Sequence, residues 1–252
     1  MELQKEREVK KLIERERKLL PRLGTRKIHY LIKADLEVQN IKFGRDKLFA
    51  LMQAHGLLIK PQRRYVQTTM SKHWLRKWPN IVKNLSVNEP DQVWMSDITY
   101  IKTEIGNCYL NLITDAFSRK IVGYAVADNM ETESMIPALV MANKHRKNNQ
   151  LETIHHSDRG LQYCSKEYAS MTAKNNIKLS MTENSDPYEN AMAERMNRTI
   201  KEEFGLNRSI KNIEQVSKLI TESVKLYNNY RPHLALKMKT PDEVYYKKIP
   251  IT

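Results

Sequence analysis

The segment that decides the fold is QVWMSDITYIKT (residues 92–103), which is followed closely by CYLNLITDAFS (108–118) and KIVGYAVAD (120–128). All three runs are rich in β-branched and aromatic residues, the composition that strands favour. The connections between them are short and contain Gly106-Asn107 and Ser118-Arg119, residue types that form tight turns. The three runs therefore predict an antiparallel meander.

Beyond the meander, helical and extended patterns alternate along the chain. Three antiparallel strands followed by alternating helix and strand predict an α/β sheet with helices on its faces. The helices and strands expected there are a helix over 132–147 capped by Thr132, a strand ending at ETIHHSD (152–158), a helix near 165–175, the strand IKLSM (177–181), a long helix over about 188–204, a helix at 212–229 leading to YNNYRPH (227–233), and a capped helix start at Thr240-Pro241-Asp242-Glu243.

The N-terminal part of the chain has a helical pattern of its own. Residues 2–20 predict a charged helix that Pro21 ends. Two short helices are expected over 26–37 and 45–55, with a break around Lys42-Phe43-Gly44. Two short helices joined by a glycine-containing turn in a basic context suggest a helix-turn-helix that binds DNA, although any helical hairpin has a similar pattern.

A basic segment punctuated by proline joins this part to the sheet. Its cations would contact phosphates, and its aromatic rings would either stack on DNA or anchor the segment to the next domain. The cations are Arg63, Arg64, Lys72, Arg76 and Lys77, and the rings belong to Tyr65, Trp74 and Trp78.

Charge is distributed unevenly along the 252 residues. Residues 1–90 hold 21 Lys and Arg against 9 Asp and Glu, whereas residues 91–252 hold 22 against 20. A basic arm on a nearly neutral domain is typical of proteins that bind a polyanion such as DNA. A solubilising surface is the alternative, and attraction to a membrane is less well supported because the cations do not line one face of an apolar helix.

Composition excludes several other classes of protein. No apolar run approaches the roughly 20 residues of a membrane span, and the charged N-terminus is not a signal peptide. Cys108 and Cys164 are too few for a disulfide framework or a Cys-rich zinc site, which favours a reducing, cytoplasmic location. No glycine-rich loop suited to a nucleotide cofactor is present.

Three acidic residues lie at positions where burying a carboxylate costs free energy unless the carboxylate has a partner or a function. Asp97 lies inside the apolar run VWMSDITYI, Asp158 falls at the end of the fourth expected strand, and Glu194 sits in the expected long helix. Three converging carboxylates repel one another, and a pair of Mg²⁺ or Mn²⁺ ions about 4 Å apart would relieve that repulsion and support phosphodiester displacement. Each could instead be an ordinary salt-bridged acid, and Asp115 in LITDAFS is a competing candidate.

Several runs together resemble the integrase core of bacterial insertion-sequence transposases, and more narrowly the OrfB-type protein of the IS-three family. They are WMSDITYI, LITDAFSRKIVGYAV, IHHSDRGLQY and SMTENSDPYENAMAERMNRTIKEEF, and GTRKIHYLI, TTMSKHW, YNNYRPH and KTP extend the likeness from about Gly24 through Pro241. Thirty-five residues separate Asp158 from Glu194, as in that family's Asp, Asp-35-Glu signature. The departures are Leu161 in place of a small polar residue and Arg198 where glycine is common.

The resemblance implies a ribonuclease-H-like fold and assigns catalysis and the binding of two Mg²⁺ ions, which Mn²⁺ can replace, to Asp97, Asp158 and Glu194. It implies that Lys201 contacts DNA beside the site and that Asn190 supports it. Asp115 would then support the metal-binding acids from behind or be structural. Arg159 and Gln162 would steer phosphates or cap a helix or loop, and His155 and His156 would serve strand packing and hydrogen bonding rather than metal ligation.

The expected function is therefore DNA transposition, by cleavage at the ends of an insertion sequence and transfer of the freed strand to target DNA. The alternatives are a nuclease of the same fold and a non-catalytic DNA-binding regulator derived from a transposase. Paired DNA ends imply a homo-oligomer, and the family implies an upstream OrfA-type protein or a frameshift fusion with it. The chain is expected to divide into a charged helix (1–22), a helix-turn-helix-like module (23–60), a basic linker (61–90), the integrase core (91–206) and a helical extension (207–252).

Overall fold

The strands form one sheet of order β3-β2-β1-β4-β5 in the computed structural model, which describes residues 2–59, 76–183, 190–206 and 208–247. β1 pairs antiparallel with β2 and β2 with β3, whereas β4 runs parallel to both β1 and β5. The predicted meander is thus confirmed, and β1 lies at the centre of the sheet. The strands are β1 Val93–Thr103, β2 Gly106–Asp115, β3 Ile121–Ala127, β4 Thr153–Ser157 and β5 Ile177–Met181.

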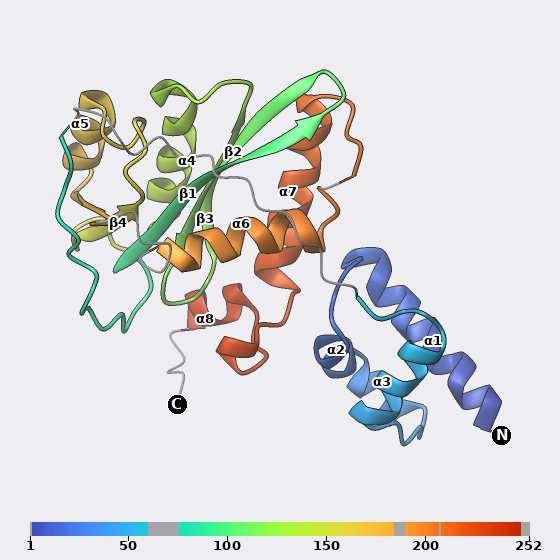
Figure 1. Ribbon diagram of the computed structural model, residues 1–252. Coiled ribbons are helices and arrows are strands. Elements are labelled where there is room, and N and C mark those ends of the chain that lie inside the picture. The colour runs from blue at the N-terminus through green and yellow to red at the C-terminus, as the bar shows by residue number, and fades with distance from the viewer. Residues whose placement is uncertain (1, 60–75, 184–189, 207, 248–252) are drawn as a thin grey trace.

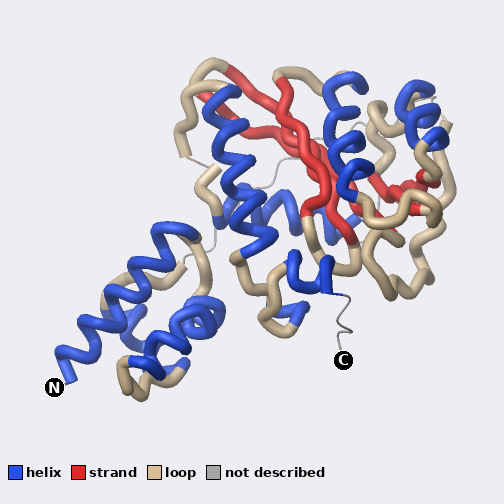
Figure 2. Tube along the Cα trace, turned by 180° about the vertical axis from the view of Figure 1, so that it is seen from behind, coloured by secondary structure: helices blue, strands red, loops and turns tan. Residues whose placement is uncertain are grey.

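Helices cover both faces of this sheet, as the two opposite views show (Figure 1 and Figure 2). α4 (Thr132–His145) and α5 (Lys166–Lys174) pack on one face, against β2, β3 and β5. α6 (Ala191–Glu203) and α7 (Ile213–Asn229) pack on the other, against β1, β2 and β3. The expected three-layer α/β arrangement is therefore present.

α4 lies very close to the sheet at Gly123 in β3. A Cβ atom there would lie 2.1 Å from the carbonyl oxygen of Ala138 and 3.0 Å from the Cβ atom of Ala142. Since backbone cannot yield by that much, only glycine allows α4 to lie this close.

Alternation along β1 determines which layer each side chain meets. Trp94 is buried with Ala138 of α4, whereas Ile101 is buried with Met196 of α6. Because successive side chains point to opposite faces of a strand, Asp97 shares the face of Ile101 and points toward α6. The sheet therefore presents this acid to the helix that carries Glu194.

The N-terminal helices make a small unit beside the core (Figure 1). They are α1 (Glu2–Leu19), α2 (Thr25–Val38) and α3 (Arg45–Ala54), so the three helices predicted there are confirmed. Polar contacts join the unit to the core: the Tyr230 hydroxyl donates to Glu16 at 2.8 Å, and Lys27 lies 3.6 Å from the Glu203 carboxylate.

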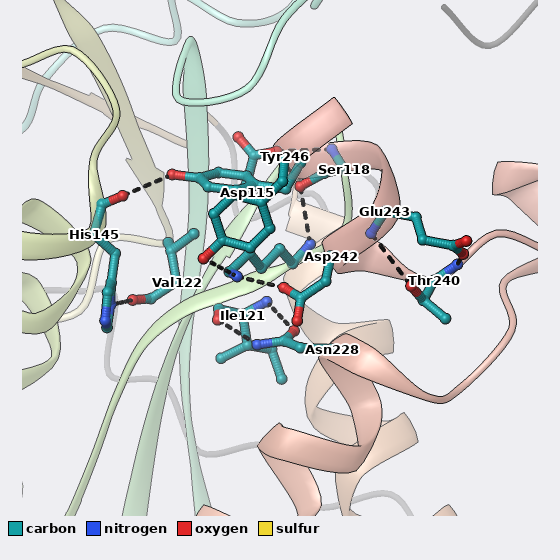
Figure 3. A network of polar contacts seen from close by, with 12 residues as sticks. Asp115, Ser118, Ile121, Val122, His145, Asn228, Thr240, Asp242, Glu243 and Tyr246 are labelled. Atoms are coloured by element: carbon teal, nitrogen blue, oxygen red, sulfur yellow. Dashed lines mark hydrogen bonds and ion pairs between the residues drawn. The ribbon is translucent and has the colours of Figure 1, made fainter. Parts of the chain in front are cut away.

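The chain beyond α7 contains a short 3₁₀ helix, Leu234–Leu236, and then α8, Pro241–Lys247. The predicted capping box is confirmed: the Thr240 N–H donates to the Glu243 carboxylate at 2.8 Å, and the Glu243 N–H donates to the Thr240 hydroxyl at 3.3 Å (Figure 3). In the described residues, no helix is long and apolar enough to cross a membrane.

Both ends of α4 differ from the sequence prediction. The N-cap of α4 is Glu131 and not Thr132, because Asn129 accepts the Glu131 N–H and the Ser134 hydroxyl and fixes the start one residue earlier. The same helix ends at His145 instead of residue 147, because Arg146 adopts an extended backbone conformation and its guanidinium group donates to the Asn175 carbonyl group.

The long helix expected over 188–204 is described from Ala191 as α6, with Asn190 as its N-cap. Residues 188 and 189 lie outside the described part of the chain. Its last residue, Glu203, is one residue before the predicted end.

Candidate active site

Strand register brings two of the three predicted acids together. Val93 pairs with Ile154 and Met95 with His156 across the parallel β1–β4 ladder. Continuing that register by two positions puts Asp97 of β1 opposite Asp158, the residue that follows β4. Because neighbouring strands lie roughly 4.8 Å apart, the two carboxyl groups share one small region near the centre of the sheet.

Helix α6 crosses this region with one polar stripe directed at β1. The Asn190 amide donates to the Ser96 carbonyl group at 3.1 Å, and the Asn197 amide donates to the Asp97 carboxylate at 2.9 Å. Glu194 is four residues after the first asparagine and three before the second, so it lies on the same stripe.

The stripe ends at Lys201, which is also bound to β1. Its ammonium group donates to the Thr99 hydroxyl at 3.2 Å and to the Tyr100 carbonyl group at 2.9 Å, and it lies 4.7 Å from the centre of the Tyr100 ring. Burial lowers the pKa of Lys201, and the negative charge of Asp97 opposes that change. The lysine is therefore held beside the acids by the sheet itself.

The acids destabilise one another's charged forms. Burial raises the pKa of Asp97 to about 8, and the charges of Asp158 and Glu194 add to that increase against the hydrogen bond from Asn197. The pKa of Glu194 is also raised, by burial first and then by Asp158. Each acid in the site thus feels the charge of another, which is the electrostatic condition that a bound cation relieves.

A tight turn orients Asp158. The Gly160 N–H donates to its carboxylate at 3.0 Å. A Cβ atom on Gly160 would lie 3.1 Å from that same carboxylate oxygen and 3.1 Å from the side-chain oxygen of Gln162, so the turn leaves little room for any side chain.

The two polar residues of this turn are engaged with the protein. The Arg159 guanidinium donates to the Thr182 carbonyl group at 2.6 Å, and the Gln162 amide donates to the Met130 carbonyl group at 2.7 Å. Both contacts hold the loop in place. Steering of phosphates by either residue remains a prediction.

Asp115, the competing acid, belongs to a different network (Figure 3). Its carboxylate accepts the Ser118 N–H at 2.7 Å, the Ser118 hydroxyl at 2.5 Å and the Asp91 N–H at 2.8 Å. It pairs with Trp94, three residues before Asp97 along β1. These donors tie Asp115 into the hydrogen-bond network of the fold, and its exclusion from metal binding stays a prediction.

The two adjacent histidines pack inside the core. Both are fully buried; His155 lies 3.1 Å from the Tyr168 hydroxyl, and His156 lies 2.8 Å from the Ser180 hydroxyl. The expectation that they serve packing and hydrogen bonding is confirmed.

The residues expected to bind DNA from the linker are described only in part. Arg63, Arg64 and Trp74 lie outside the described residues. Arg76 and Lys77 are exposed, and Arg76 lies 5.6 Å from the ring centre of Trp78, which packs against the core. Trp78 therefore anchors the linker, and DNA contacts by the two cations stay a prediction.

Two residues of the site were missed from the sequence. Asn197 is three residues from Glu194 and seven from Asn190, so helical spacing alone could have placed it on the stripe. Gly160 follows Asp158 by two residues, the spacing at which a backbone N–H can bond back to an Asp side chain. Both signals are local and were readable.

The donor set suits a hard divalent cation. The three acids supply carboxylate oxygens, and the side-chain oxygens of Asn190 and Asn197 are buried beside them without a donor among the described residues. Within those residues no three His, Cys, Asp or Glu side chains are close enough to hold one ion together, so the carboxylates do not form a closed ligand shell. Oxygen ligands and unrelieved negative charge fit Mg²⁺ or Mn²⁺.

Two family models match the chain, both described as an integrase core domain, over residues 87–187 and 175–241. The chain is 34% identical to an uncharacterised 31 kDa protein of insertion element IS600 from Shigella sonnei over 84% of its own length and 77% of that protein. It is 31% identical to the transposase of IS904 from Lactococcus lactis, over 77% of each. It is also 31% identical to transposase InsF of IS3A from Escherichia coli, over 67% of this chain and 59% of InsF.

Solved structures support the fold. The HTLV-2 integrase catalytic core domain in complex with magnesium superposes with a TM-score of 0.51 at 18% identity, over 63% of this chain and 98% of that one. A simian T-cell lymphotropic virus intasome chain gives a TM-score of 0.54 at 16% identity, over 88% and 74%. The expected ribonuclease-H-like integrase core is confirmed. By sequence and fold together, this chain belongs to the IS3 family of insertion-sequence transposases, and its function is that of a DNA transposase.

Proposed function

We propose that this chain cleaves DNA at the ends of an insertion sequence and joins the freed strand to target DNA, using divalent cations held by Asp97, Asp158 and Glu194. The observation that carries the proposal is the meeting of Asp97 and Asp158 across the β1–β4 ladder, under a helix whose polar stripe includes Glu194. The raised pKa of Asp97, caused partly by the other two acids, supports a shared site.

Divalent ions bound there, taken to be two Mg²⁺ ions for which Mn²⁺ can substitute, would activate the attacking oxygen and stabilise the leaving oxygen of a phosphodiester. The protein's part is orientation. Asn197 holds one carboxylate oxygen of Asp97, Gly160 holds one of Asp158, and Asn190 fixes the first turn of α6 to Ser96. Three acids fixed in this way do not have to reorganise when charge develops during displacement.

The remaining partners follow from the same proposal. Lys201 stands beside the acids, where a substrate phosphate would compete with Thr99 and Tyr100 for its ammonium group. Arg76, Lys77 and the N-terminal helices would bind DNA outside the site. Pairing of two element ends requires at least two copies of the chain, and an OrfA-type protein would supply further end recognition.

The test is strand transfer with purified full-length chain, DNA carrying the ends of the element that encodes it, and Mg²⁺. Wild type should nick the ends and join them to target, and Glu194→Gln should do neither. Glu214→Gln is the matched control, because Glu214 is an exposed acid in the first turn of α7 as Glu194 is in the first turn of α6.

Two outcomes would contradict the proposal. Equal joining by Glu194→Gln and wild type would remove Glu194 from the site. Cleavage by wild type without any joining would support the nuclease alternative instead.

A further inference from the structure

Three buried polar atoms that have no hydrogen-bond partner among the described residues gather at the end of α7 and in the turn that follows it. Among the described residues, the Tyr227 hydroxyl, one terminal nitrogen of Arg231 and Nε2 of His233 are enclosed and make no hydrogen bond. The Tyr227 ring contacts both of the others: its centre lies 5.2 Å from that of His233 and 5.4 Å from the Arg231 guanidinium carbon. Buried unpaired donors are rare in native proteins, and three at one place indicate a missing partner.

Positive charge is in excess at the same place. Burial lowers the pKa of His233 strongly, and the charges of Arg231, Lys27 and Arg119 lower it further. Glu203 meets two of these cations, binding Arg231 through two bonds of 2.6 Å and lying 3.6 Å from Lys27. Arg231 and Lys27 therefore share one carboxylate, and Arg119 adds a third positive charge nearby.

Arg119 is the cation that this carboxylate does not bind. Among the described residues, its guanidinium group donates to the Met192 sulfur, a weak acceptor. Asp115 is within electrostatic reach of Arg119, but its oxygens already accept from Ser118 and Asp91. The guanidinium group thus retains most of its capacity to donate.

The Asn228 side chain links the end of α7 to the segment that carries Arg119. The Asn228 side chain bonds both the N–H and the carbonyl group of Ile121 at 2.9 Å, which joins the end of α7 to the start of β3, two residues after Arg119 (Figure 3). Arg119 itself has a φ of 65°, a left-handed conformation that is uncommon outside glycine. Strained backbone of this kind is kept where surrounding structure holds it, often at binding sites.

We propose that Arg119, Tyr227, Arg231 and His233 form a binding site for a phosphate group. A phosphate offers several acceptor oxygens and negative charge, so one group could satisfy the unpaired donors and the excess cations together. Arg119 and His233 keep part of their surface exposed and so form the accessible side.

A backbone phosphate of DNA is the expected occupant, and this identification alone rests on the proposed function. Arg119 contacts Met192, two residues before Glu194, so a strand bound at the acids would pass beside it. A free phosphate ion is the other possible source.

The first experiment measures thermal unfolding of the full chain with inorganic phosphate, at constant ionic strength and without divalent metal. Wild type should melt on the order of 5 °C higher in a large excess of phosphate over its Kd. Arg119→Met should lose that response, and Lys174→Met, an exposed lysine on α5 in the opposite layer, should keep it.

Arg119→Met should also melt no lower than wild type in phosphate-free buffer, because it removes an excess cation and leaves no acid unpaired. A merely structural arginine would leave the variant less stable but equally responsive to phosphate. His233→Phe is the second variant; it keeps the ring against Tyr227 and removes the Nε2 donor, and it should weaken the response as well. Equal responses in wild type and both variants would overturn the proposal.

The second experiment measures binding of a DNA duplex across a salt series, again without metal. If a backbone phosphate occupies the site, Arg119→Met should bind about 5-fold more weakly, with the salt slope smaller by about one ion. Loss of the response to inorganic phosphate with unchanged duplex binding would identify free phosphate as the occupant. Because neither experiment requires catalysis, failure of the carboxylate assignment would not alter them.

Discussion

Two groups of three acids lie on or beside the sheet, and their surroundings differ. Asp97, Asp158 and Glu194 form the first group: burial raises the pKa of Asp97 to about 8, and the charges of Asp158 and Glu194 add to that increase. Asp91, Asp115 and Asp242 are instead surrounded by donors, which include the Trp94 indole, the Tyr245 hydroxyl and the Lys120 ammonium group. Acids that receive many donors hold a fold together, whereas acids that repel one another are kept for a cation or a reaction.

Asp97→Asn should show the largest effect and should separate activity from stability. Strand transfer in Mg²⁺ should fall by about 10³-fold or more, because a neutral amide is a poor cation ligand. The melting temperature without metal should not fall, since the change removes a repelled, desolvated charge and Asn197 can still donate to the new side chain. Asp128→Asn, at an exposed acid after β3, is the control for both measurements.

A drop in melting temperature as large as the one expected for a broken buried network would contradict this assignment. It would place Asp97 with the structural acids.

The pH dependence of stability should reveal Asp115. Burial raises its pKa to about 6 in the folded chain, above the ordinary value near 3.8, despite the donors from Ser118 and Asp91. A raised folded-state pKa stabilises the protein fully below the unfolded value, and that contribution is lost as pH rises through about 6. The unfolding free energy of wild type relative to Asp115→Asn should therefore fall between pH 4 and 6, by up to about 3 kcal/mol.

Denaturant unfolding of both proteins at pH 4, 5, 6 and 7 measures this difference, and the other titrating groups cancel. A difference that stays constant over the range would show that the carboxylate is ionised in the fold at every pH tested.

The sequence predicted those features of the fold and the site that depend on residues close together along the chain. The period-two runs and turn residues predicted the meander, and Asp97 and Asp158 fall opposite each other because both strands run parallel from nearly level starts. The Thr240 capping box was likewise readable over four residues. Each of these signals spans only a few neighbours along the chain.

The contacts of Asp91, Asp115 and Asp242 could not be predicted from local sequence in that way. Asp91 adopts a φ of 67°, unusual for a non-glycine residue, and its carboxylate accepts from Tyr245, 154 residues away. The end of α4 likewise depends on Arg146 reaching the carbonyl group of Asn175. Contacts between distant segments decide such features, and no local pattern encodes them.

Gly160→Ala should have a smaller effect than Asp97→Asn, because it changes only the position of the Asp158 carboxylate and no charge. The new Cβ atom would lie 3.1 Å from the Asp158 carboxylate oxygen and must displace it by a few tenths of an ångström. Strand transfer should fall about 10-fold, because small misplacements of a catalytic group are costly. Gly44→Ala is the control, since a Cβ atom there meets nothing within 4 Å. Unchanged activity would mean that the turn does not orient Asp158.

Ser118→Ala should produce the smallest effect, and only on stability. The hydroxyl donates to Asp115 at 2.5 Å and accepts from the Lys120 N–H at 3.2 Å, while the Ser118 N–H would continue to hold the carboxylate. Losing one buried hydrogen bond to a charged group should lower the unfolding free energy by about 1–2 kcal/mol, with strand transfer unchanged at temperatures where the variant is folded. Ser170→Ala, at an exposed position of α5, should be nearly neutral in the same denaturant titration. A loss of strand transfer in folded Ser118→Ala would show that the network around Asp115 affects catalysis. The functional distinction between the two groups of acids would then be wrong.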